Sequence, residues 1–306
     1  MGQTRYTLSA LLNTSFPDPV WAVDDVIPVG LTDLAGRPKI GKSWLALQIA
    51  GAVSSGGSVL GRQVQQGRVL FIALEDSPRR LQDRLKAQGI SPSAELEFAF
   101  EWPRLDVGGI GALAAELAAV RYRLVVIDTL SRALGRLDQN DIGKMSDTIG
   151  RLQETALSNN TALLGLDHHR KTGAFDSDPL DDVLGSTGKT APLDCALGLY
   201  RDRAGGFVLK GRGRDMPEVD LALAWDPVSC TWQSNGSAAQ FAMAGNRSKI
   251  LAALRAAVPD ALTASDVASE TGIDRKNTTT ILNDLCDSGA VRKLPKVGRN
   301  VPYVLV

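Results

Sequence analysis

Eight consecutive residues near the N-terminus constrain the fold of this chain more than any other segment. They read Gly36-Arg37-Pro38-Lys39-Ile40-Gly41-Lys42-Ser43 and match the pattern G-x-x-x-x-G-K-[ST]. In this pattern the backbone N–H groups of a glycine-containing loop face phosphates, the lysine charges the β/γ-phosphate site, and the hydroxyl ligates Mg²⁺. We therefore predict a site for ATP and Mg²⁺ formed by Gly36, Pro38, Lys39, Ile40, Gly41, Lys42, Ser43 and Trp44.

A true phosphate loop has a strand before it and a helix after it, whereas a chance match to the pattern need not. Here Leu31–Ala35 reads as a strand, and Ser43–Ser54 has apolar residues at helical spacing. Further apolar runs typical of buried parallel strands then alternate with helical segments. The predicted strands are 68–74, 123–127 and 162–166, and the predicted helices are 78–88, 110–119 and 142–159.

Turn-separated short strands are predicted at 196–200, 206–209 and 220–225, as an antiparallel edge. The predicted fold is therefore α/β, with a mostly parallel central sheet, helices on both faces and antiparallel edge strands. We expect an ATPase domain at 1–233 with an entry segment at 1–30. A linker rich in small residues at 234–245 and a separate small domain at 246–306 follow.

Two predicted strands end in carboxylates. Asp128 follows the apolar run Leu124–Ile127, where it would hold Mg²⁺ together with Ser43. Glu75 follows the run that begins at Arg68, and it is our candidate for the base that orients the attacking water. The alternatives are an Asp128 that only caps the next segment, and a Glu75 that only starts a helix with Asp76.

These motifs together resemble the RepA-like and DnaB-type hexameric ATPases and helicases, which have a RecA-like fold and an AAA-type P-loop. The resemblance covers roughly residues 20–233. It rests on the base Glu75 in the strand after the P-loop helix, on His168 in the segment Leu163–Lys171, and on Lys210-Gly211-Arg212. It implies that His168 senses the γ-phosphate; the alternative for His168 and its neighbour His169 is a polar pair at the sheet edge.

The same resemblance implies that Lys210 and an arginine reach into the ATP site of a neighbouring subunit. Arg212 and Arg214 both fit the arginine position, and Arg201 and Arg203 compete with them. A shared site predicts a homo-oligomer, expected to be a hexameric ring, with single-stranded DNA passing through it. Loops 131–141 and 170–190 are the candidate DNA loops, because they leave the sheet beside the nucleotide; the alternative is that both are simply solvated.

The C-terminal segment resembles a winged helix-turn-helix domain, with three helices, the first at 247–257, and a β-hairpin. Asp274 would cap the third helix. The first turn of that helix would enter the major groove of duplex DNA. The predicted DNA contacts are Arg275, Lys276, Asn277 and Thr278 in that helix, and Lys296 and Arg299 in the wing. Winged helices also bind proteins, so a protein partner remains the alternative.

Charge supports DNA contact only weakly. The whole chain has 34 Lys/Arg and 34 Asp/Glu, but residues 246–306 hold nine basic and six acidic residues, which leaves this segment at +3. No segment approaches the roughly 18 consecutive apolar residues of a membrane span, and no secretion signal is evident. We therefore expect a cytoplasmic protein that is not associated with a membrane. The three cysteines are far apart, which disfavours a zinc site or a disulfide framework.

The leading hypothesis is an ATP-driven DNA motor or loader of the RepA-like class, which would serve replication of a plasmid, phage or integrated element. The second is an ATP-gated DNA-binding regulator in which slow hydrolysis acts as a timer. The third is a signalling ATPase whose winged helix binds protein. A small-molecule kinase is more distant, because no acceptor-binding lid is apparent and a base such as Glu75 suits water.

Overall fold

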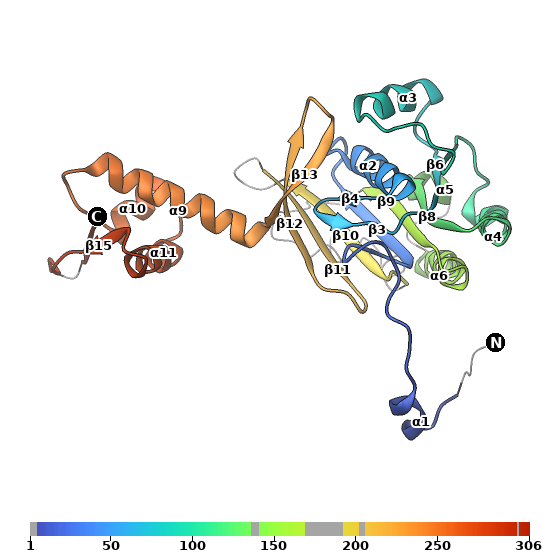
Figure 1. Cartoon of the computed structure of the whole chain (residues 1–306), viewed down its shortest axis with the longest axis horizontal. Helices are drawn as coiled ribbons and strands as arrows, with labels where there is room; N and C mark the ends of the chain where they lie inside the picture. The colour runs from blue at the N-terminus through green and yellow to red at the C-terminus, as the bar shows by residue number, and fades with distance from the viewer. Residues whose placement is uncertain (1–4, 136–140, 169–191, 202–205, 299) are drawn as a thin grey trace. The chain divides into compact units, whose positions relative to one another are not determined.

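The computed structural model describes residues 5–135, 141–168, 192–201, 206–298 and 300–306 (Figure 1). Some residues of the sequence-based predictions lie outside these ranges. They are His169, Arg203 and Arg299 and, within the two candidate DNA loops, Arg136, Lys171 and Lys189. The chain divides into two compact units, Met1–Ser234 and Asn235–Val306, which are described separately.

The first unit is built on a sheet that has nine strands in the described part of the chain, in the order β13-β12-β11-β10-β3-β9-β8-β6-β7 (Figure 1). From β10 to β7 all neighbours are parallel, whereas β10, β11 and β12 pair antiparallel. The predicted mixture of a parallel centre and an antiparallel edge is thus confirmed. The strand bounds are β3 Gly30–Gly36, β6 Arg68–Ala73, β7 Leu96–Ala99, β8 Tyr122–Asp128, β9 Ala162–His168, β10 Cys195–Arg201, β11 Phe207–Gly213, β12 Val219–Asp226 and β13 Thr231–Ser237.

Helices cover both faces of this sheet, because the buried strands are apolar on both sides. Along β8, Leu124 and Val126 join one core cluster, while Val125 and Ile127 join the other. Helix α2 (Lys42–Ser55) packs in the first core, and α4 (Ile110–Ala119) and α6 (Ile142–Ser158) pack in the second. The remaining elements of this unit are α1 Leu8–Asn13, α3 Pro78–Ala87, η1 Leu105–Gly109, α5 Leu130–Leu134, and the short strand pairs β1 Trp21–Val23 with β2 Ile27–Pro28 and β4 Ser58–Val59 with β5 Arg62–Gln63.

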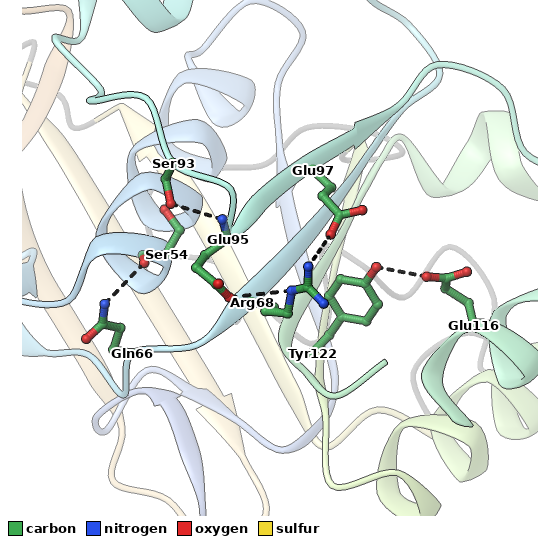
Figure 2. Close-up of polar contacts among 8 residues, drawn as sticks. All are labelled: Ser54, Gln66, Arg68, Ser93, Glu95, Glu97, Glu116 and Tyr122. Carbon is green, nitrogen blue, oxygen red and sulfur yellow. Dashed lines mark hydrogen bonds and ion pairs between the residues drawn. The ribbon is translucent and has the colours of Figure 1, made fainter. Parts of the chain in front are cut away.

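The two ends of the parallel strands carry different chemistry. At the amino ends, polar side chains pair with one another, as Figure 2 shows: Arg68 lies 3.5 Å from Glu95 and 3.3 Å from Glu97. The Tyr122 hydroxyl donates to Glu116 at 2.8 Å, and burial is the main cause that raises the pKa of this phenol. These contacts tie β6, β7, β8 and α4 together, so the amino edge stabilises the sheet. The carboxyl ends of the strands carry the residues of the site described below.

The described residues of the second unit form three helices and a three-stranded antiparallel sheet of order β14-β16-β15. Its helices enclose a small apolar core that includes Ile250, Val267, Leu282, Leu285 and Tyr303. The Asp274 carboxylate accepts from the backbone N–H groups of Lys276 and Asn277, which confirms the predicted cap. The element bounds are α9 Ala238–Ala257, β14 Leu262–Thr263, α10 Ala264–Thr271, α11 Arg275–Asp287, β15 Val291–Lys293 and β16 Pro302–Leu305.

The prediction of a linker at 234–245 is wrong. Strand β13 continues to Ser237, and α9 begins at Ala238 with no residue between them. The small residues that suggested a flexible linker include three alanines between 238 and 242, and alanine has the highest helix propensity of all residues. The helix predicted at 247–257 therefore starts nine residues earlier than its apolar spacing suggested.

None of the helices in the described ranges is long and apolar enough to cross a membrane.

Candidate functional site

The phosphate loop lies between β3 and α2, as the sequence predicts. Gly41 is the N-cap residue of α2 and has φ +110°, a conformation that side chains with a Cβ rarely adopt. The first backbone N–H groups of a helix have no partner within it, and the positive end of the helix dipole lies there. The start of α2 is therefore suited to bind phosphate.

Lys42, the first residue of α2, is a charged residue in a buried position, with 6% exposure. Its ammonium group donates to the carbonyl oxygens of Gly36 at 2.8 Å and Arg37 at 3.1 Å, and it lies 3.3 Å from His168 Nδ1. Burial lowers the pKa of Lys42 to about 8, although Asp128 and three further carboxylates oppose the shift. The loop carbonyl oxygens thus hold the Lys42 ammonium group near the start of α2, while burial destabilises the charged form of the side chain.

Ser43 and Asp128 form the oxygen pair expected for Mg²⁺. Asp128 ends β8 and is 5% exposed; burial raises the pKa of its carboxyl group, and a hydrogen bond with the Ser43 side chain opposes that rise. Mg²⁺ prefers hard oxygen ligands and keeps several water molecules, so one hydroxyl and one carboxylate beside a phosphate site fit this ion. The alternative, an Asp128 that only caps the next segment, is not favoured, because Thr129 provides the cap of α5.

Glu75 lies just beyond the end of β6, on the same edge of the sheet. Its Oε1 accepts from the Thr129 hydroxyl at 3.1 Å and lies 3.5 Å from Arg132 Nε. The Glu75 side chain is 39% exposed, so water can reach the carboxylate. The site therefore contains an oriented, solvent-accessible carboxylate opposite the phosphate loop, which is the arrangement that a base for water requires.

Asp76 is engaged elsewhere. It pairs with Arg80 at 3.1 Å and with Arg84 at 2.6 Å, and its side chain is 7% exposed. The N-cap of α3 is Ser77, whose hydroxyl accepts from the backbone N–H of Arg80. Asp76 thus orients two arginines of α3 and does not cap that helix.

A cavity of about 330 Å³ brings these groups together. Eight predicted site residues line it, and two lining residues were not predicted, Arg84 and Thr129. Gly36, Pro38 and Ile40 do not line it: Gly36 contributes a carbonyl oxygen to Lys42, Pro38 is exposed, and Ile40 packs against the core. The cavity is lined by Lys39, Gly41, Lys42, Ser43, Trp44, Glu75, Arg84, Asp128, Thr129 and His168.

The two residues that the sequence analysis missed had faint signals. Thr129 directly follows Asp128, where a hydroxyl could be expected to orient a neighbouring carboxylate. Arg84 stands eight residues after Asp76, at helical spacing with Arg80, and its guanidinium lies 5.3 Å from the centre of the Trp44 ring. Arg84 is therefore held between the Asp76 carboxylate and an aromatic face of the cavity wall.

The residues expected to act on a neighbouring subunit lie apart from this cavity. Lys210 and Arg212 are on β11, two strands away from β3, and Arg214 follows that strand. Lys210 Nζ lies 6.0 Å from the Tyr200 ring, Arg212 pairs with Glu218 at 2.9 Å, and the Arg214 backbone N–H donates to Asp194. Arg201 lies over the Phe207 ring at 5.7 Å. None of these four residues lines the cavity of its own chain.

The predicted DNA contacts in the second unit are partly supported by exposure. Arg275, Lys276 and Asn277 are exposed in the first turn of α11, and Lys296 is exposed between β15 and β16. Thr278 is fully buried, and its hydroxyl donates to the carbonyl oxygens of Ile273 and Asp274, so the prediction that it contacts DNA is wrong. The helical spacing of α11 places Thr278 on the side that faces the core.

A phosphate loop that leads into a helix at the carboxyl edge of a parallel sheet, beside a Ser43–Asp128 pair, defines a P-loop NTPase. A family model described as an AAA domain matches residues 3–174, and the chain belongs to this family. The match supports nucleotide binding and ATPase activity in general, and Mg²⁺ commonly accompanies the nucleotide in such sites.

Nucleotide binding is expected to be coupled to proton uptake above neutral pH. With the pKa of Lys42 near 8 before nucleotide binds, part of the lysine is neutral there, and a bound triphosphate raises this pKa by favouring the ammonium form. Affinity should therefore be highest below pH 8 and fall as pH rises through the pKa of the free protein. Titration calorimetry at a pH of about 8.5, where phosphate groups are already ionised, should detect uptake of up to one proton in buffers of different ionisation enthalpy.

Lys42→Arg is the matched control, because arginine stays protonated at this pH. It should bind nucleotide without proton uptake. Equal uptake by the wild type and Lys42→Arg would contradict the assignment to Lys42.

Proposed function

We propose that this protein is an ATP-hydrolysing ring ATPase that acts on DNA, of the RepA-like replicative class, with a C-terminal winged helix. The observation that carries the proposal is the composition of one cavity: Lys42, Asp128, Glu75 and His168 surround it, while Lys210 and Arg212 lie away from it. This division matches a site that two neighbouring subunits complete. ATPase activity itself follows from the family; the ring and the DNA are the proposal.

Each group in the cavity has a role in hydrolysis. The N–H groups at the start of α2 and the Lys42 ammonium group bind the phosphates, and Ser43 and Asp128 would hold Mg²⁺. Mg²⁺ held there would offset the negative charge that develops on the phosphate oxygens during hydrolysis. Glu75, held by the Thr129 hydroxyl, orients a water molecule and accepts its proton.

His168 is the residue that would sense the γ-phosphate, and it lies on the strand next to β3. It ends β9, and its Nδ1 lies 3.3 Å from Lys42 Nζ. The Asp167 carboxylate accepts from the His168 backbone N–H at 2.8 Å, which fixes the backbone at the end of β9. A phosphate that draws Lys42 away from His168 would release the His168 ring from its contact with Lys42.

An arginine from a neighbouring subunit would complete the site. Charge builds on the γ-phosphoryl oxygens as the bond to the leaving group breaks, and a well-placed arginine contributes about 10³–10⁵ in rate. Arg212 and Glu218 are both exposed, so their ion pair contributes little to stability. Hydrolysis would then depend on assembly.

A test of the shared site follows from mixing variants. Glu75→Gln should lower the hydrolysis rate by about 10²–10⁴, and Arg212→Ala by about 10³–10⁵, each measured as steady-state ATP turnover. Mixed before assembly, the two variants should recover activity, because an Arg212→Ala subunit keeps its Glu75 and receives Arg212 from a Glu75→Gln neighbour. Activity of the wild type should also rise with protein concentration.

The control mixes Glu75→Gln with Lys42→Ala. Both defects lie in the same cavity, so a mixed interface gains no complete site and no activity should return. Failure of Glu75→Gln and Arg212→Ala to complement one another would exclude Arg212 as the residue supplied in trans.

An ATP-gated DNA-binding regulator is the second candidate function, and one contact favours it. Arg132 Nε lies 3.5 Å from Glu75 Oε1, the oxygen that also accepts from the Thr129 hydroxyl, so this ion pair competes with a water molecule for that oxygen. Such a site would hydrolyse ATP slowly and act as a timer. A signalling ATPase that binds protein through its second unit remains the third alternative.

Single-stranded DNA separates a motor from a regulator. For a motor, steady-state ATP turnover should rise several-fold when single-stranded DNA is added, and Glu75→Gln should abolish the rise. Turnover that is indifferent to single strands over the same protein concentrations would contradict the motor and leave the regulator.

Duplex DNA should bind through the first turn of α11. Arg275→Ala and Lys276→Ala in the full chain should each weaken binding of duplex DNA and reduce its salt dependence by about one in log–log slope for each phosphate that the protein no longer neutralises. Fluorescence anisotropy of labelled duplex DNA across salt concentrations measures both quantities. Arg79→Ala and Lys86→Ala, exposed cations on α3 of the first unit, are the controls and should change neither. Equal losses of affinity in both pairs would point to binding without a specific face.

A further inference from the structure

The indole ring of Trp232, on strand β13, lies against the phosphate loop. Trp232 is 2% exposed, and its Nε1–H donates to the Gly41 carbonyl oxygen at 3.2 Å. A Cβ added to Gly41 would lie 2.6 Å from the Trp232 ring, so glycine is needed here for contact with the indole as well as for its φ. The loop is thus in direct contact with a strand that comes 191 residues later in the chain.

This hydrogen bond fixes the orientation of one peptide group in the phosphate site. The Gly41 carbonyl oxygen accepts from Leu45 N–H within α2 and from the Trp232 indole. Because a trans peptide is planar, with its C=O and N–H pointing in opposite directions, a carbonyl held toward Leu45 and Trp232 turns the Lys42 N–H out of the helix end. That N–H is one of the phosphate-binding donors of the loop.

Further contacts hold β13 against α2. The Gln48 side chain accepts from the Trp232 backbone N–H at 2.8 Å and donates to the Trp232 carbonyl oxygen at 2.9 Å. Gln88 Nε2 donates to the carbonyl oxygens of both Trp44 and Cys230, at 2.9 Å and 2.8 Å. The Trp225 ring packs between the rings of Trp44 and Trp232, at 5.8 Å and 5.1 Å. The strand is therefore attached to a cavity-lining residue as well as to the loop.

We propose that Trp232 is a positioning residue for the phosphate loop, and that its strand thereby responds to nucleotide. β13 spans Thr231–Ser237, so the response is expected along these residues. The proposal rests on nucleotide binding at the cavity, and it does not depend on a ring or on DNA.

The test uses the full chain and two single variants. Trp232→Phe keeps an aromatic ring and removes the hydrogen bond to Gly41; Gln48→Leu removes both bonds to the Trp232 backbone and does not line the cavity. We expect each to weaken binding of Mg²⁺ with ADP or a non-hydrolysable ATP analogue about 3- to 10-fold, measured by titration calorimetry, because one or two neutral hydrogen bonds that position the loop are lost while the phosphate-binding groups remain.

Trp102→Phe is the matched control. The Trp102 indole also donates to a glycine carbonyl oxygen, that of Gly109, at the same distance of 3.2 Å, and Trp102 does not line the cavity. It should lower thermal stability to a similar degree and leave nucleotide affinity unchanged. A merely structural Trp232 would give the same result as Trp102.

Hydrogen exchange supplies the second measurement. In the wild type, nucleotide should slow amide exchange in 231–237, and this protection should disappear in Trp232→Phe at nucleotide concentrations that saturate the variant. Unchanged affinity in both variants, or no nucleotide-dependent protection of 231–237 in the wild type, would overturn the proposal while leaving the ATPase intact. A wild type that binds no nucleotide would overturn the ATPase as well, so the two failures are distinct.

Discussion

The buried charge of Lys42 is the constraint on which the rest of the nucleotide site depends. An ammonium group in a buried position is costly unless its donors are satisfied, and here the Gly36 and Arg37 carbonyl oxygens satisfy two of them. Four carboxylates, those of Asp128, Asp167, Asp33 and Glu75, act on it electrostatically and offset part of the cost. The same carbonyl contacts fold the loop back over the lysine, so the loop keeps the shape in which a phosphate can replace them.

Sheet topology explains why residues far apart in sequence meet around that lysine. β3, β9, β8 and β6 are neighbours in this order, and they are parallel, so their carboxyl ends share one edge. The loop, His168, Asp128 and Glu75 follow these strands in turn. Sequence analysis could predict this convergence, because each strand is a continuous apolar run with a polar residue at its end. The bounds of β8 and β9 each extend only one or two residues beyond the predicted apolar runs.

What the sequence could not predict depends on contacts between distant segments. Apart from Trp232, the residues of β13 are polar or small, so little in the local sequence marks them as a strand. The strand pairs beside β12, and the contacts of Trp232 with Gly41 and Gln48 hold it against α2. Arg84 enters the cavity wall because Asp76 and Trp44 hold it, and neither contact has a sequence pattern of its own. Thr278 is predicted to contact DNA because it lies near the start of α11. The way in which α11 packs on its core decides which of its side chains are buried, and Thr278 is one of them.

The proposal of a shared site depends on which charges around the cavity are already paired. Among the described residues that line it, Arg84 is neutralised by Asp76 at 2.6 Å, and the nearby Arg132 is paired with Glu75. Lys39 and Lys42 are the other cations among the described lining residues, and the Lys42 ammonium group already donates to two carbonyl oxygens of the loop. Under the proposed shared site, a residue that arrives only when subunits assemble would add positive charge without being buried unpaired in the free subunit. The proposal assigns this role to Lys210 or Arg212, which lie on β11 and do not line the cavity of their own chain.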